Sequence, residues 1–257
     1  MARGLNEEQI SEMMGLLKKA DSVEMKLSVP EEHHRSTIVA LDMDALNAQV
    51  RQVFFFDTPD LALDRAGVVV RARRVQGKGG DSVVKLRPVV PNELPKSLRK
   101  LPGFGVEVDA MPGGYVCSGR LKEPTDNDLI RRVGKGEAPL RKLFAKEQRA
   151  LFSAHAPEGI TFEDLSVLGP VFVLKLPFTP AELGRKLVAE LWFYPNGTRI
   201  LELSTKCLPA DMLTAWSDVR NYLIERGVDR TGDQQAKTKT ALTFFSKQLK
   251  AAAEGSA

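Results

Sequence analysis

Charged residues alternate with apolar ones in several short segments of this chain, and their spacing decides which of them can act together. Side chains of a β-strand point to opposite faces in turn, so residues two apart share a face. Segment 23–26 (VEMK) therefore places Glu24 and Lys26 on one face. The same rhythm recurs with bases in VRAR (70–73) and VKLR (84–87), and with acids in VEVD (106–109) and LELSTK (201–206). Each such strand collects its charges on one side.

The basic pairs lie on consecutive predicted strands, Arg71 and Arg73 on one and Lys85 and Arg87 on the next. On an open antiparallel sheet the charged face would simply be the solvent side. Neighbouring strands would then hold like charges side by side, where they repel. A bound anion relieves this repulsion. A sheet closed into a barrel, with a polar lumen and apolar outer faces under helices, would enclose that anion. The pattern favours this barrel over the open sheet.

Acidic residues should face the same lumen, among them Glu24, Glu107, Glu190 and Glu202. Carboxylates and a phosphate chain repel each other unless a hard cation lies between them. Such an ion would bridge phosphate oxygens, neutralise developing charge and orient a water for attack. The sequence therefore indicates Mg²⁺ or Mn²⁺ as cofactor.

Runs rich in β-branched and aromatic residues predict the strands that position these charges. We expect eight strands, at 23–29, 49–56, 68–74, 82–88, 105–110, 171–178, 186–194 and 199–206. GKGG at 77–80 and PNG at 195–197 are typical hairpin loops, which favours an antiparallel meander. Helical periodicity predicts helices at 6–19, 36–46, 58–65, 126–155, 209–226 and 234–253. Gly134, Gly136 and Pro139 should divide the fourth of these into two or three helices.

These segments resemble the CYTH, or triphosphate tunnel metalloenzyme, family, which includes inorganic triphosphatases, thiamine triphosphatases and class IV adenylyl cyclases. The motifs that carry the resemblance are VEMK (23–26), FFDTPDLALDRAGVVVRAR (55–73), VVKLRP (83–88), VEVD (106–109), LELSTK (201–206) and, more weakly, AKTKTAL (236–242). The resemblance implies an α+β fold, a closed eight-stranded antiparallel β-tunnel with a polar lumen, flanked by helices. We expect a single domain over 1–257, with the tunnel at about 22–242 and a helical insertion at about 121–159.

The resemblance also implies roles for individual residues. It assigns phosphate binding to Lys26, Arg71, Arg73, Lys85, Arg87, Lys175 and Lys206, metal binding to Glu24, Glu107, Glu190 and Glu202, and catalysis to Glu24, Lys26 and Glu202. Lys175 could equally be a lysine on the solvent side. Ser22 and Ser204 stand where the family's paired acids would supply further carboxylates. With fewer carboxylates the metal binds more weakly, so phosphate binding is implied more securely than hydrolysis.

The leading functional expectation is divalent-metal-dependent hydrolysis of inorganic triphosphate or a small organic triphosphate. The first alternative is a catalytically reduced protein that binds polyphosphate or a nucleotide. The second is an adenylyl cyclase, which would also need a pocket for the base. The expected partner is a triphosphate or polyphosphate small molecule, and nothing in the sequence indicates an oligomeric state.

Other features exclude several classes of protein. The formal charge is +4, from 37 Lys and Arg against 33 Asp and Glu, which does not indicate a nucleic-acid coat. Cys117 and Cys207 lie too far apart for a zinc motif or a disulfide framework. His33 and His34 have no further ligand nearby and are expected to be solvated. The P-loop, G-x-S-x-G and H-E-x-x-H motifs do not occur. With no signal-peptide core and no membrane-spanning stretch, we expect an unprocessed cytoplasmic protein.

Overall fold

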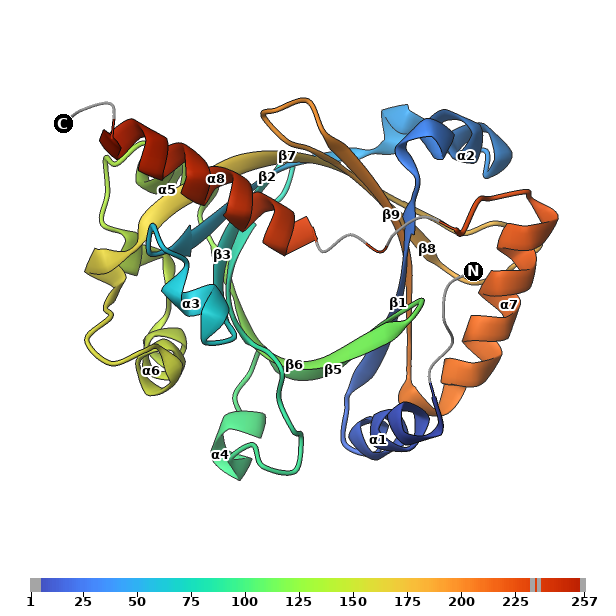
Figure 1. Ribbon diagram of the computed structural model, residues 1–257, viewed down its shortest axis with the longest axis horizontal. Coiled ribbons are helices and arrows are strands. Elements are labelled where there is room, and N and C mark those ends of the chain that lie inside the picture. Colours follow the sequence, from blue (N-terminus) through green and yellow to red (C-terminus); the bar gives the residue numbers. More distant parts are fainter. Residues whose placement is uncertain (1–5, 232–233, 235–236, 255–257) are drawn as a thin grey trace.

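The computed structural model describes residues 6–231, 234 and 237–254. Within these residues, nine strands form a closed barrel in the order β1-β5-β6-β4-β3-β2-β7-β8-β9 (Figure 1). The strands are β1 (Ser22–Val29), β2 (Gln49–Asp57), β3 (Val68–Val75), β4 (Gly80–Leu86), β5 (Phe104–Met111), β6 (Gly114–Thr125), β7 (Ser166–Phe178), β8 (Leu187–Phe193) and β9 (Arg199–Cys207). The closed barrel flanked by helices confirms the predicted fold class.

Two details of the predicted barrel are wrong. β6 is a ninth strand, which the sequence concealed because Gly114, Gly119 and Pro124 interrupt its apolar pattern. The barrel is also not wholly antiparallel, since β1 pairs with β5 in parallel. The two errors have one cause. Directions can alternate around a closed ring only when the number of strands is even, so a ring of nine must contain a parallel pair.

Both predicted hairpins are present, because β3 pairs with β4 and β8 with β9 in antiparallel fashion across the two predicted turns. The described residues form eight helices, and all except α8 cover the outside of the barrel, with α5 and α6 on the left of Figure 1 and α1 and α7 on the right. They are α1 (Glu7–Leu17), α2 (His34–Ala40), α3 (Ala62–Arg65), α4 (Lys96–Arg99), α5 (Asn127–Gly134), α6 (Lys146–His155), α7 (Met212–Glu225) and α8 (Lys237–Glu254), with five short 3-10 turns among the described residues. None of these helices has the length and apolarity needed to cross a membrane.

The predicted helical insertion begins inside β6, and the rest of it packs against the outer wall. Helix α5 ends at Gly134, and Pro139 precedes the 3-10 turn Leu140–Leu143, so the predicted division of this segment is confirmed. Phe144 and Phe152 pack against Phe162, with ring centroids 5.0 and 4.2 Å apart. This cluster covers the outward side chains of β2, β3, β4 and β6, and thereby leaves their alternate residues to face the lumen.

Helix α8 belongs to the interior of the barrel. Its Leu242 and Phe245 pack among apolar residues on the inner faces of β2, β3 and β8, including Val53, Phe55 and Trp192. Figure 1 shows α8 crossing one side of the barrel mouth beside β2 and β7. One part of the interior is therefore an apolar core, and the charged residues occupy the remainder.

Gln148 of α6 is fully buried and forms hydrogen bonds between the insertion and the barrel wall. Its side-chain nitrogen donates to the carbonyl oxygens of Ser82 and Leu121, at 3.0 and 3.1 Å. Its side-chain oxygen accepts from the Ser82 hydroxyl at 2.9 Å and from the amide of Ala145 at 3.0 Å. All the hydrogen-bonding atoms of the amide are thus satisfied where β4 and β6 lie side by side.

Replacing Gln148 by Ala is expected to lower the free energy of unfolding by about 3 kcal/mol, because buried donors and acceptors lose their partners and a cavity forms. Urea denaturation measures the change. Gln248→Ala, an exposed residue of α8, is the matched control and should change stability by less than about 0.5 kcal/mol. Equal effects of the two substitutions would contradict the anchoring role.

Candidate functional site

The DTPD segment shapes the turn that leads into β3. Asp57, at the end of β2, is buried, and its carboxylate accepts from the backbone amides of Thr58, Leu63 and Asp64 at 2.7 to 2.9 Å. After α3 the chain turns at Gly67, where φ is +74°. A Cβ added at this position would lie 2.2 Å from the backbone oxygen of Arg87, the residue that follows β4. This segment therefore sets where β3 begins, and with it which β3 residues face the lumen.

Bases and acids of the inner faces line the lumen and form several separate groups of ion pairs. All the predicted site residues except Arg87 contact one another or lie among these charges. Arg87, at the end of β4, instead lies 3.5 Å from Asp64 of α3, at the rim. The lining also contains residues that the sequence prediction did not assign to the site, namely Arg51, Asp81, Asp109, Arg120, Lys122 and Lys237.

Glu24, Glu107 and Asp109 form an acidic cluster, with one carboxylate oxygen from each within 4.8 Å of the others. The parallel pairing of β1 with β5 produces it, because Glu24 lies opposite Asp109. Among the described residues this is the one group of three acids close enough to share a metal ion. Three carboxylates suit the preference of Mg²⁺ and Mn²⁺ for oxygen ligands, so these residues fit the implied cofactor.

Lysines neutralise this acidic cluster. Lys26 lies 2.7 Å from Asp109 and 3.1 Å from Glu24, Lys85 lies 3.0 Å from Asp109, and Lys206 pairs with Glu107. Burial by itself would raise the pKa of Asp109, but attraction to Lys26 and Lys85 outweighs it and holds that pKa below its usual value. Asp109 is therefore ionised at neutral pH, and a metal ion would compete with Lys26 and Lys85 for it.

Glu190 and Glu202 make a second, separate acidic pair. They lie opposite each other on β8 and β9, and Lys237 bridges them at 2.7 Å to each. Lys175 lies 3.1 Å from Glu190, so it faces the lumen and not the solvent. The four glutamates that the sequence combined into one metal site thus fall into two groups in the structure.

Lys237 comes from the AKTKTAL segment and is the first residue of α8; Ala236 of that segment lies outside the described residues. Its ammonium also sits 5.0 Å from the centre of the Trp192 ring. Burial would lower the pKa of Lys237, but attraction to Glu202 and Glu190 raises it overall. The AKTKTAL motif predicted that a lysine of this segment belongs to the site. Only the position of α8 in the structure shows that this lysine is Lys237, which pairs with Glu190 and Glu202.

Arginines on the other side of the lumen are less completely paired with acids. Arg73 makes two bonds of 2.9 Å to Asp81, which Lys122 approaches at 3.5 Å. Arg71 is different, because its Nε is buried and no described residue accepts a hydrogen bond from it. Burial, followed by repulsion from Arg73, lowers the pKa of Arg71 to about 9. A desolvated guanidinium without a carboxylate partner is a candidate binding site for an anion.

Arg51 of β2 adds to this positive region, since its guanidinium donates only to the side-chain oxygen of Gln49, at 2.7 and 3.1 Å, among the bonds found in the described residues. Burial and the nearby Arg73 lower its pKa as well. The lumen therefore contains acidic groups held by lysines and an arginine-rich region in which Asp81 pairs with Arg73, while Arg51 and Arg71 form no ion pair with a described residue.

Comparisons with known proteins agree with this architecture. No protein-family model matches the chain, and no curated protein matches it. A candidate adenylate cyclase from Bacillus halodurans superposes with a TM-score of 0.57 at 11% identity, covering 85% of this chain and 98% of that one. A candidate adenylyl cyclase from Hippeastrum, with a dominant triphosphatase activity, superposes with a TM-score of 0.56 at 17% identity, covering 82% and 91%.

These likenesses show the fold. The chain is a closed β-barrel protein, flanked by helices and with a charged interior, of the architecture that those two proteins share. The sequence-based resemblance to the triphosphate tunnel family is thereby supported at the level of the fold.

Proposed function

We propose that this protein hydrolyses inorganic triphosphate or a small organic triphosphate in the barrel lumen, with Mg²⁺ or Mn²⁺. The observation that carries the proposal is the buried Nε of Arg71, which has no hydrogen-bond partner among the described residues and lies beside Arg73, in the same lumen as an acidic cluster suited to a divalent cation. The dominant triphosphatase activity of the Hippeastrum protein supports the same reaction.

Each group of the lumen has a task in this proposal. Arg71, Arg73 and Arg51 bind phosphate oxygens, for which the guanidinium fork is well shaped. Lys26 and Lys85 change partners, from carboxylate to phosphate, once a cation neutralises the acids. Glu24, Glu107 and Asp109 would hold the metal, which supplies charge neutralisation and an oriented water when bound. The protein contributes positioning and a fixed electrostatic environment.

A second candidate function is binding without turnover. It is favoured by the observation that lysines already pair with every acid of the cluster. The family resemblance agrees, because Ser22 and Ser204 stand where the family's paired acids would supply carboxylates. A protein of this kind would capture polyphosphate or a nucleotide through its arginines and lysines and would need no metal.

One experiment separates the two functions. Phosphate release is measured from tripolyphosphate, ATP and thiamine triphosphate with Mg²⁺ or Mn²⁺, alongside cyclic AMP formation and the shift in melting temperature. Hydrolysis predicts metal-dependent release, whereas binding alone predicts that tripolyphosphate raises the melting temperature more than orthophosphate does, with no release. Absence of both effects would refute both functions.

The Ser22→Glu variant tests whether the metal site lacks a ligand. Ser22 lies opposite Glu107 on the paired strands, and its hydroxyl donates to that carboxylate at 3.4 Å. A carboxylate here would join the acidic cluster, so the metal concentration for half-maximal phosphate release is expected to fall about tenfold. Ser36→Glu, on exposed α2, is the control and should change nothing. An unchanged or higher metal requirement for Ser22→Glu would mean that other residues hold the metal.

A further inference from the structure

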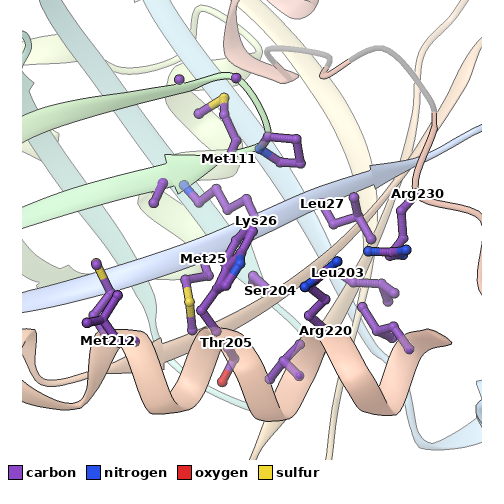
Figure 2. A pocket seen from close by; sticks show the side chains of 18 of the residues that line it. Met25, Lys26, Leu27, Met111, Leu203, Ser204, Thr205, Met212, Arg220 and Arg230 are labelled. Carbon is purple, nitrogen blue, oxygen red and sulfur yellow. The ribbon is translucent and has the colours of Figure 1, made fainter. Parts of the chain in front are cut away.

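A deep groove of about 550 Å³ lies on the outside of the barrel, beneath α7 (Figure 2). Its walls come from α1, α7, the β5–β6 hairpin and the outward faces of β1 and β9. Met25, Leu203, Met212 and Leu223 line it although each is itself almost fully buried. Residues on a flat apolar patch would be exposed, so the burial of these residues indicates that the groove is narrow.

The groove exists because the parallel pairing of β1 with β5 is short. The pairing stops at Met25 and Ala110, whereas β1 continues to Val29 with β9 alone beside it among the described strands. The β5–β6 hairpin turns at Gly113, where φ is +82°, and residues of this turn line the groove. The resulting gap lets the groove reach Lys26 and Ser204, which line its floor while the ammonium of Lys26 stays on Asp109. The groove thus abuts the lumen wall.

The opening of the groove is also apolar. Leu213 is 70% exposed, Ile10 46% and Trp216 41%, and all three line it. Exposed apolar side chains gathered at one concavity commonly mark a binding site. A hydrocarbon chain would be shielded from water on most sides in this slot.

Two arginines give the groove a charged end. Arg220 and Arg230 line it, and Figure 2 shows them at the same end, beside Leu27. No acidic residue of the described chain lines the groove, and neither arginine makes an ion pair within 4.0 Å with a described residue. The groove therefore combines an apolar slot with two arginines that form no ion pair with a described residue, and Asp229 beside Arg230 offsets only part of their charge.

We propose that this groove binds a single-chain anionic amphiphile, with the hydrocarbon chain along Met25, Leu203 and Trp216 and a carboxylate or phosphate head at Arg220 and Arg230. Guanidinium groups bind such heads through paired hydrogen bonds. The slot favours one chain over a partner helix, which would need a broader and shallower surface. This site goes beyond the proposed hydrolysis, because its arginines and its apolar walls take no part in the lumen.

Decanoate below its micelle concentration is the probe, with decanol and decyltrimethylammonium as neutral and cationic ligands of the same chain length. Calorimetry should show saturable binding of one decanoate per chain, about tenfold or more tighter than the cation. The Arg220→Ala, Arg230→Ala double variant should bind decanoate about 10- to 100-fold more weakly, which corresponds to the loss of charge-assisted hydrogen bonds, with decanol binding unchanged. No saturable decanoate binding would overturn the proposal, as would a double variant that binds decanoate normally.

Two further variants on one helix locate the site. Leu213→Glu places a negative charge in the groove, whereas Ile224→Glu changes an exposed residue of α7 that does not line it. Only Leu213→Glu should weaken decanoate binding, and both should keep the tripolyphosphate-induced rise in melting temperature, so failure of this site is distinguishable from failure of the lumen. Equal effects of the two variants would overturn the assignment. So would a dimer that Leu213→Glu dissociates, because a second copy would then cover the groove.

Discussion

The Arg71→Met variant is expected to bind tripolyphosphate about 10- to 100-fold more weakly and yet to unfold no more easily than the wild type. Met keeps the length of the apolar stem and removes the guanidinium, whose buried Nε has no partner in the described protein. Loss of a charge-assisted hydrogen bond costs about 1.5 to 3 kcal/mol of binding. Removal of an uncompensated buried charge offsets the loss of packing in the free protein.

Arg74→Met is the matched control, on the same strand. Arg74 points away from the lumen and donates to the backbone oxygen of Asn127 in α5, at 3.1 Å. It should lower stability slightly and leave the affinity for tripolyphosphate unchanged. Calorimetry measures affinity, and thermal denaturation without ligand measures stability. If Arg71→Met binds tripolyphosphate as tightly as wild type, the arginine-rich region is not the phosphate site.

The Glu24→Gln variant is expected to lose about 100-fold or more of metal-dependent phosphate release while it retains affinity for tripolyphosphate. The substitution removes one charged ligand of the acidic cluster but none of the bases that would bind phosphate. A metal ion contributes several kcal/mol to a phosphoryl-transfer transition state, and each 1.4 kcal/mol is about tenfold in rate. Lys26 keeps Asp109 as its partner at 2.7 Å, so the fold should survive.

Glu32→Gln, an exposed glutamate outside the barrel, controls for a simple loss of charge and should turn over normally. Phosphate release is measured across a metal titration, and tripolyphosphate affinity is measured without metal. Unchanged turnover in Glu24→Gln would move the metal site to the other acids, of which Glu190 and Glu202 are the nearest alternative. A wild type that releases no phosphate from any triphosphate would leave binding as the function.

The strand pattern could be predicted from the sequence because strand alternation is local. All eight predicted strands are present, with ends that differ by one or two residues except in β7, which begins at Ser166 and not at Val171, and both predicted hairpins join the expected neighbours. The ninth strand, β6, was not predicted because glycines and a proline, which usually interrupt strands, occur within it. Its outward residue Leu121 is buried under the insertion and Cys117 is buried beside α1, so tertiary packing overrode the weak local preference.

Some residues of the site could also be predicted from the local sequence alone. VEMK and VRAR place their charges on one face whatever the rest of the fold does, which is why Glu24, Lys26, Arg71 and Arg73 were found. Asp109 lies in the VEVD segment that the sequence pointed to, but its role depends on β5 lying parallel to β1. Lys237 depends on a helix that returns into the barrel about thirty residues after the last strand.

The sequence alone determined which side chains share a face of each strand and that the shared face is charged, because a period of two needs no knowledge of neighbours. Only the tertiary structure decided which base meets which acid. The strand order β1-β5-β6-β4 is not sequential, so Lys26 and Lys85 meet at Asp109, while the Nε of Arg71 is left without an accepting partner in the described chain. Ion pairing depends on distances of a few ångströms across the barrel, and those distances follow from strand order and register, which local spacing does not specify.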